Sequence, residues 1–251
     1  MNKDYVIGIP TRGRFDMLQQ TLEAISNQSL LPNYVVIVNN NDDVHYLDNL
    51  CFYGLDVRII QSLENKSASA GHQLILEYAI NVDVIVRWDD DLVPYKDCME
   101  NIVVPVCSGQ TVACGGVYPR VGEKRKIYSK WNIPDGNLCH AQFFLWNVEQ
   151  QLKTHHLYSS FAYNRQVALD VGGFCLEYSK IGVREETDFS LRINNVAGPL
   201  LINTKAVAVH YVVVGGTRDV AINTEQRKEM KHCDLVLFRK RMADLNIDWD
   251  F

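Results

Sequence analysis

Hydrophobic and polar positions follow two alternating periods along the first half of the chain. Runs of β-branched and aliphatic residues predict strands at residues 5–10, 34–38 and 57–60, and a fourth that starts at residue 82. Between them, apolar residues recur at helical spacing over residues 14–28 and 67–80, which predicts two helices. Strands that alternate with helices form a parallel sheet whose faces the helices cover. We therefore expect an α/β fold with a mostly parallel central sheet.

The second half of the chain carries the same two patterns less regularly. They predict helices at residues 98–107, 165–171, 185–196 and 222–242, and strands at 111–118, 161–164 and within 199–214. Residues 122–150 lack both periods and predict an irregular, partly basic excursion. No internal repeat, low-complexity tract or linker-like run divides the sequence. A single domain over residues 1–251 is therefore the simplest organisation.

The fourth predicted strand ends in three adjacent carboxylates, Asp89, Asp90 and Asp91, and we expect Pro94 to stop regular sheet soon afterwards. Adjacent acids repel one another, so they destabilise a fold unless a positive charge lies among them. Magnesium and similar cations prefer oxygen ligands and are usually held by one or two carboxylates plus substrate phosphates. The triplet is therefore either a solvated acidic turn or a site that holds a cation against a diphosphate.

Other polar residues fall at the carboxyl ends of the predicted strands, which is where ligands bind in open α/β sheets. They are Thr11, the cluster at residues 39–42, the region at residues 65–69 and the triplet itself. This coincidence favours the functional interpretation of the triplet over the solvated turn.

Two further features are candidates for the same site. In the helix predicted at residues 185–196, Glu185 and Asp188 share a face with Arg192 and could form a surface ion ladder. A carboxylate of this segment, most simply Glu186, could instead serve as a general base. His210 lies in an otherwise apolar strand, where it is either a satisfied core residue or a neutral ligand that completes a metal site. Spacing alone leaves both questions open.

Composition narrows the class of protein. Hydrophobic residues make up 47% of the sequence and charged residues 22%, as in ordinary globular proteins. No apolar run is long enough to cross a bilayer, and the N-terminus lacks the layout of a signal peptide. Seven cysteines without a CxxC pair predict reduced thiols rather than a disulfide framework or a zinc site. We therefore expect a cytoplasmic protein.

Two basic clusters stand out against the net charge of −5. One spans residues 120–130, with Tyr128 and Trp131 alongside, and the other lies on the last predicted helix at Lys228, Lys231 and residues 239–241. Charge runs are usually solvated faces. The alternative is contact with an anionic acceptor, whose bases or sugar rings would stack on the aromatic side chains.

Six segments, taken in order along the chain, form one pattern. They are IGIPTRGR (7–14), VVIVNNND (35–42), WDDD (88–91), FAYNRQVALDVGGF (161–174), REETDFSLR (184–192) and VAVH (207–210). Together they resemble the motifs of family-2 nucleotide-sugar glycosyltransferases, with WDDD similar to the DxD motif. The resemblance covers roughly residues 5–218. It implies a GT-A fold with a nucleotide-binding half at 1–94, an acceptor-side half at 95–219 and a C-terminal helix at 220–251.

Carried over position by position, the resemblance implies a donor site, a metal site and a base. Asp89, Asp91 and His210 would hold Mn²⁺ or Mg²⁺. Glu186 stands where the family has its base aspartate, with Glu185 and Asp188 as alternatives. Asn39 stands where the family usually has aspartate, so the usual uracil contact would differ. The donor-binding residues would be Pro10, Thr11, Arg14, Asn39, Asp42, Ser67, Asp89, Asp90 and Arg218.

The resemblance thus implies a metal-dependent inverting glycosyltransferase that moves a sugar from a nucleotide-diphosphate donor, most simply a UDP-sugar, to an acceptor hydroxyl. The acceptor would be a glycan or a small molecule, and the basic clusters leave room for a nucleic acid such as a hydroxymethylated DNA base. One alternative is a sugar-1-phosphate nucleotidyltransferase, which would need a glycine-rich loop where residues 10–14 offer one glycine. The other is a non-catalytic module that binds sugar nucleotides or glycans.

Overall fold

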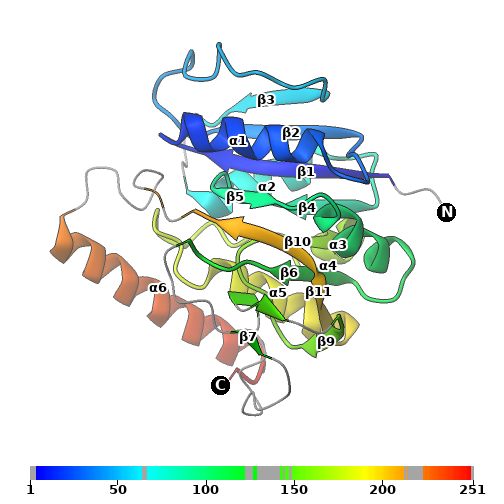
Figure 1. The fold of residues 1–251 in the computed structure, drawn as a ribbon. Helices are drawn as coiled ribbons and strands as arrows, with labels where there is room; N and C mark the ends of the chain where they lie inside the picture. Colours follow the sequence, from blue (N-terminus) through cyan, green and yellow to red (C-terminus); the bar gives the residue numbers. More distant parts are fainter. Residues whose placement is uncertain are drawn as a thin grey trace.

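A mixed β-sheet runs through the middle of the computed structural model, with helices on both faces (Figure 1). The structure describes residues 4–63, 67–121, 127–128, 142–143, 145–146, 149–211, 213 and 223–249. Within these ranges the strand order is β3-β2-β1-β4-β10-β6-β11-β5, and β9 pairs with β11 at the side. The predicted α/β class is confirmed.

The first four strands of this order are all parallel. They are β3 (Val57–Gln61), β2 (Tyr34–Asn39), β1 (Tyr5–Thr11) and β4 (Val84–Arg87). The helices α1 (Phe15–Ser26) and α2 (Ala68–Tyr78) connect them as the sequence pattern predicts. Because the strands are parallel, their carboxyl ends meet at one edge, which places Thr11 and the acidic triplet side by side.

The remaining strands mix the two directions. Strand β10 (Phe161–Asn164) runs antiparallel between β4 and β6 (Ala113–Val117), and β6 pairs in parallel with β11 (Leu200–His210). Two short antiparallel partners of β11, β5 (Leu92–Pro94) and β9 (Gln151–Thr154), complete this sheet. The pair β7 (Ile127–Tyr128) and β8 (Leu145–Trp146) lies outside it. The helices of this half are α3 (Cys98–Cys107), α4 (Arg165–Asp170), α5 (Glu185–Ala197) and α6 (Thr224–Asp244).

Regular sheet ends at Pro94, as the sequence predicts, but a short strand that the sequence does not predict precedes this proline. The chain turns after the acidic triplet and forms β5, in which Pro94 lies opposite Ala208. Proline cannot donate a ladder hydrogen bond, but β5 is the last strand in the order, and proline is tolerated at a sheet edge. This turn brings the triplet next to the end of β11.

Two apolar clusters lie on the two faces of the sheet. Alternate residues of β1 divide between them, since Tyr5 and Ile7 join the cluster with α1 and α3, whereas Val6 joins the cluster with α2 and α5. Trp88 is fully buried in the first cluster, directly before the triplet. The carboxylates therefore emerge from a well-packed strand, which limits their freedom to move apart.

No helix in the described part of the chain is long and apolar enough to cross a membrane. The six cysteines that the structure describes are unbonded, as the sequence predicts, and Cys139 lies outside the described residues.

Candidate active site

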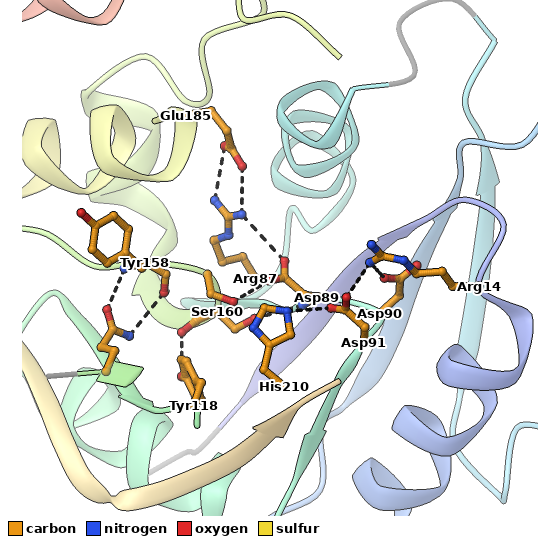
Figure 2. A network of polar contacts seen from close by, with 12 residues as sticks. Arg14, Arg87, Asp89, Asp90, Asp91, Tyr118, Tyr158, Ser160, Glu185 and His210 are labelled. Atoms are coloured by element: carbon orange, nitrogen blue, oxygen red, sulfur yellow. Dashed lines mark hydrogen bonds and ion pairs between the residues drawn. The ribbon is translucent and has the colours of Figure 1, made fainter. Parts of the chain in front are cut away.

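The acidic triplet at the end of β4 is held by the turn that follows β1. The Thr11 hydroxyl donates a hydrogen bond of 2.8 Å to Asp90 Oδ2. Arg14 Nη1 lies 2.9 Å from Asp90 Oδ1 and 2.7 Å from Asp91 Oδ2, so one guanidinium joins two neighbouring carboxylates (Figure 2). Arg14 precedes α1 as its N-cap residue, but its side chain makes no cap hydrogen bond. The positive charge that three adjacent acids require is therefore supplied in part by the protein itself.

The pairing of β5 with β11 brings a histidine to the triplet. His210 lies opposite Leu92 in this antiparallel pair, and the Tyr211 amide donates to the Asp91 carbonyl at 2.9 Å. His210 Nε2 is consequently 3.3 Å from Asp91 Oδ1 (Figure 2). Within the described residues, His210 Nδ1 is buried and has no hydrogen-bond partner.

The carboxylate of Asp91 and the imidazole of His210 form a donor set that suits a divalent cation. Among the described residues, no group of three potential ligands meets the geometry of a complete metal site. Manganese and magnesium do not require one, because they keep water and bind substrate phosphates when the protein supplies one or two ligands. The two residues therefore fit as the protein's half of such a site.

A buried ion pair connects the triplet to the start of α5. Arg87 Nη2 and Nη1 lie 3.0 Å and 3.3 Å from the two carboxylate oxygens of Glu185, and Arg87 Nη2 is 4.0 Å from Asp89 Oδ1. Figure 2 shows this chain of contacts from Glu185 through Arg87 to Asp89. On its other side, Asp89 Oδ2 accepts a hydrogen bond of 2.5 Å from the Ser159 hydroxyl. These contacts fix α5 relative to the end of β4.

Glu186 follows Glu185 at the start of α5 and has one carboxylate oxygen that the described residues leave unbonded. Its Oε2 atom is buried and, among the described residues, makes no hydrogen bond. Glu186 lines the same cleft, of about 160 Å³, as Asp89, Asp91 and His210. An unpartnered buried carboxylate oxygen is costly unless a ligand uses it. The cleft thus brings an unbonded carboxylate oxygen into the same space as Asp91 and His210.

The sequence profile of Glycosyl transferase family 2 matches residues 6–173. The chain belongs to this family. The match ends before α5 and His210, so the geometry of the second half adds residues that the profile does not reach.

Solved structures with the same fold include glycosyltransferases of the GT-A type. GalNAc-T7, in complex with UDP, GalNAc and Mn²⁺, superposes with a TM-score of 0.70 at 13% identity over 98% of this chain and 55% of that one. TarS 1–349 of S. aureus, in complex with UDP-GlcNAc, gives 0.66 at 13% identity over 98% of this chain and 68% of the TarS chain. This chain therefore spans about half the length of GalNAc-T7. No curated protein sequence is significantly similar to it.

Most of the predicted site residues of this family-2 chain meet in the cleft. Its lining includes Pro10, Thr11, Arg14, Asp89, Asp90, Asp91, Glu185, Glu186 and His210. Asp188 does not line it, because its carboxylate is fully buried between α5 and α6, 2.6 Å from Arg192 Nε and 2.6 Å from Arg241 Nε. Arg218 lies outside the described residues.

Three predicted donor-binding residues have other partners and do not line the cleft. Asn39 is fully buried and donates to Gln61 Oε1 at 2.8 Å. Ser67 is the N-cap of α2, where its hydroxyl accepts a hydrogen bond of 3.1 Å from the Ala70 amide. Asp42 is exposed and pairs with Arg12 at 3.2 Å.

Sequence reasoning missed several residues that line the cleft. Asn40 and Ala68 fall within the regions at residues 39–42 and 65–69 that the sequence indicated without singling them out, and Arg12 directly follows the predicted Thr11. In the sequence, Arg87 and His72 are indistinguishable from other residues of a strand and a helix. Tyr158 and Ser159 belong to no recognisable motif. The cleft residues that the sequence did not indicate are Arg12, His72, Arg87, Phe143, Tyr158 and Ser159.

Burial and charge shift the ionisation of the site. Burial raises the pKa of Asp90 to about 6, although Arg14 offsets part of the effect. Burial also raises the pKa of Glu185 to about 7, which Arg87 opposes and the neighbouring Glu186 supports. For Asp89 burial is outweighed by Arg87 and the Ser159 hydroxyl, so its pKa is lowered. Burial and the nearby Arg87 lower the pKa of His72 well below its usual value, which keeps that imidazole neutral.

Proposed function

We propose that this family-2 protein is a metal-dependent, inverting glycosyltransferase that uses a nucleotide-diphosphate sugar, with a UDP-sugar as the expected donor. The observation that carries the proposal is the shared cleft. Asp91 and His210 lie within 3.3 Å of each other on one side, and the unpartnered oxygen of Glu186 faces the same space. Glycosyl transfer by direct displacement needs both features, one for the leaving group and one for the attacking hydroxyl.

The donor would lie along the carboxyl edge of β1, β2 and β4. The nucleotide would contact the side chains of Pro10, Thr11 and Asn40, which line the cleft. Its phosphates would lie near the positive charges of Arg12 and Arg14. Asp91 and His210 would hold Mn²⁺ or Mg²⁺, with Asp89 as the third candidate ligand. When bound, such a cation stabilises the negative charge that develops on the departing diphosphate.

Glu186 is the proposed general base. Its carboxylate takes the proton of the acceptor hydroxyl while the acceptor oxygen forms a bond to the anomeric carbon. The bond from that carbon to the diphosphate oxygen breaks, and the nucleoside diphosphate leaves with the electron pair. Attack from the face opposite the leaving group inverts the configuration and requires one such carboxylate. Glu185 is a poorer candidate because both its oxygens are engaged by Arg87.

The donor is tested by thermal unfolding with UDP-, GDP-, dTDP- and CMP-sugars, each with and without manganese. A ligand that binds the folded state raises the unfolding temperature by mass action. We expect one nucleotide, UDP first, to raise it in a manganese-dependent way, and Asp91→Asn to abolish the manganese-dependent part. The matched change Asp56→Asn, at an exposed residue of the β2–β3 connection, should leave the shift intact. No shift with any donor would contradict the proposal.

The base is tested by Glu186→Gln. This change keeps the size of the side chain but replaces the basic carboxylate by an amide that cannot take the proton. Donor hydrolysis should therefore fall by about 10²-fold or more while the donor-induced thermal shift persists. Glu77→Gln makes the same chemical change on the exposed side of α2 and should hydrolyse the donor at the wild-type rate. Unchanged hydrolysis in Glu186→Gln, or its loss in Glu185→Gln alone, would assign the base elsewhere.

A further inference from the structure

A second, larger cavity adjoins the catalytic cleft. It has a volume of about 710 Å³ and lies between the start of α5 and the first half of α6. Arg120, Phe143, Tyr158 and Glu186 line both the cleft and this cavity. A molecule that fills the cavity therefore contacts Glu186 from a space that Asp91 and His210 do not line. That is the position of an acceptor, if Glu186 is the base as proposed above.

The cavity wall is strongly basic although the whole chain carries a net charge of −5. Among its described lining residues, five carry a positive charge and one, Glu186, is acidic. A concave site with charge of one sign focuses its field and attracts ligands of the opposite sign. The basic residues are Arg120, Arg184, Arg227, Lys228 and Lys231.

Helix α6 presents one continuous face to this cavity. The lining residues Thr224, Lys228, Lys231 and Leu235 recur at helical spacing, and the same face buries Phe238 and Met242 further along. In its second half this face packs on the core, and in its first half it carries cationic side chains. The cationic residues are exposed, but they continue the stripe that is buried further along, so they face the same side of the helix as the cavity.

The opposite wall of the cavity is anchored to α6 by a buried carboxylate. Asp234 of α6 accepts hydrogen bonds from the Ser179 amide at 2.7 Å, the Ser179 hydroxyl at 2.8 Å and the Val183 amide at 2.9 Å. Asp234 is only 1% exposed. These hydrogen bonds fix the distance between α6 and the loop at residues 179–183, and the fold therefore maintains the cavity between them.

Arg184 adopts a backbone conformation that arginine rarely takes. It has φ 74° and ψ 9°, in the left-handed region, and directly precedes α5. This conformation costs a residue with a Cβ roughly 1 kcal/mol or more relative to glycine. The side chain lines the cavity, and its Nη1 donates a hydrogen bond of 2.6 Å to the Tyr158 hydroxyl. Strain of this kind accumulates at functional sites, which points to a role for the guanidinium here.

We propose that this cavity binds a phosphate group of the acceptor, next to the hydroxyl that Glu186 deprotonates. Arginine guanidinium and lysine ammonium groups bind phosphate oxygens. The cavity is lined by five such groups, and a ligand with a single carboxylate would neutralise only one of their positive charges. The acceptor is then a phosphorylated hydroxyl compound, either a phosphorylated polyol or sugar or a nucleic acid. The inference rests on the proposed function, since Glu186 defines the acceptor side.

Three ligands with one carbon skeleton test the proposal. Glycerol 3-phosphate, glycerate and glycerol are titrated into the protein at saturating UDP and magnesium, with binding followed by calorimetry. We expect glycerol 3-phosphate to bind at least tenfold more tightly than glycerate, and glycerol not to bind. The double variant Lys228→Glu/Lys231→Glu should weaken glycerol 3-phosphate at least tenfold. Lys240→Glu, on the opposite face of α6, should change it less than twofold.

The outcomes separate this proposal from the proposed function. Loss of glycerol 3-phosphate binding when UDP saturates the protein would place the phosphate in the donor site and overturn the inference. Equal affinity in wild type and double variant, or equal affinity for glycerate, would also overturn it. If UDP itself fails to bind the wild type, the proposed function fails instead. Tight binding of an oligothymidylate that depends on Lys228 and Lys231 would identify the phosphate as that of a nucleic acid.

Discussion

At the scale of single residues, Arg14 lies where the electrostatics of the site are most demanding. Its guanidinium contacts the carboxylates of both Asp90 and Asp91, and it is itself largely buried. These contacts offset part of the repulsion between neighbouring acids, but they do not compensate the burial of Asp90, whose pKa remains raised at about 6. The ionised form of Asp90 is therefore a source of instability at neutral pH.

Replacing Asp90 by asparagine should stabilise the metal-free protein at pH 8. The native state holds the Asp90 proton more tightly than the unfolded chain, whose pKa is near 3.8, so the free energy of unfolding falls as the pH rises from about 4 to about 6. Asp90→Asn removes this loss, which amounts to at most about 3 kcal/mol. Urea unfolding in EDTA at pH 4, 6 and 8 measures it. A variant that is less stable than wild type at pH 8 would contradict the assignment.

One predicted residue shows how far strand patterns reach at this scale. The motif at residues 35–42 indicated Asn39, but Asn39 pairs with Gln61 across β2 and β3, and the next residue, Asn40, lines the cleft. Successive side chains of a strand point to opposite sides, so an error of one position changes the face entirely. The sequence located the strand end, but only the backbone register identifies which asparagine lines the cleft.

At the scale of elements, the buried side chain of Asp234 attaches α6 to the loop that precedes α5. The three hydrogen bonds that Asp234 accepts come from the loop at residues 179–183, which leads into Arg184 and α5. Because α5 begins directly after this loop, the hydrogen bonds of Asp234 connect α6 to the helix that carries Glu185 and Glu186.

Asp234→Ala should lower the free energy of unfolding by about 3 kcal/mol, because it leaves two backbone amides and a hydroxyl without an acceptor. It should also increase hydrogen exchange at the amides of Ser179 and Val183. Glu229→Ala, an exposed acidic position of the same helix, should change stability by no more than about 0.5 kcal/mol. Equal effects of the two substitutions in urea titrations would refute the anchoring role.

The predicted elements match the structure where local periodicity is strong. The strands β1 to β4 and the helices α1 to α3 were each predicted to within a few residues. The strands β5 and β9 were not, because they contain three and four residues and pair with β11, more than forty residues later. Pairing with the partner strand determines their conformation more than their own sequence does, because β-propensity depends strongly on the neighbouring strands.

At the scale of the whole molecule, the Arg87–Glu185 pair joins the parallel half of the sheet to the second half. Arg87 ends β4 and Glu185 begins α5, and both side chains are at least 96% buried, with exposures of 3% and 4%. Aromatic rings of Phe161 and Phe174 cover the guanidinium. The pair thus fixes the distance between the sheet edge that carries the acidic triplet and the segment that carries Glu186.

Replacing only one residue of this pair should lower the free energy of unfolding by more than replacing both, because the remaining charge then loses its partner. Arg87→Met and Glu185→Leu each leave a buried charge without its partner and should cost about 3–5 kcal/mol, whereas the double variant should cost well below the sum. The exposed pair Arg58–Asp56 serves as the control and should give a coupling energy below about 1 kcal/mol. Additive effects of Arg87→Met and Glu185→Leu in urea titrations would show that they do not act as a pair.

Strand β10 has a consequence for the order in which the protein can assemble. It inserts between β4 and β6, yet it is made of residues 161–164. While the ribosome is still synthesising the chain before that point, β4 has an open flank with unsatisfied amides and carbonyls. The nascent N-terminal half is consequently exposed to self-association until the central strand arrives, and cotranslational folding of this protein is complete only after most of its length has emerged.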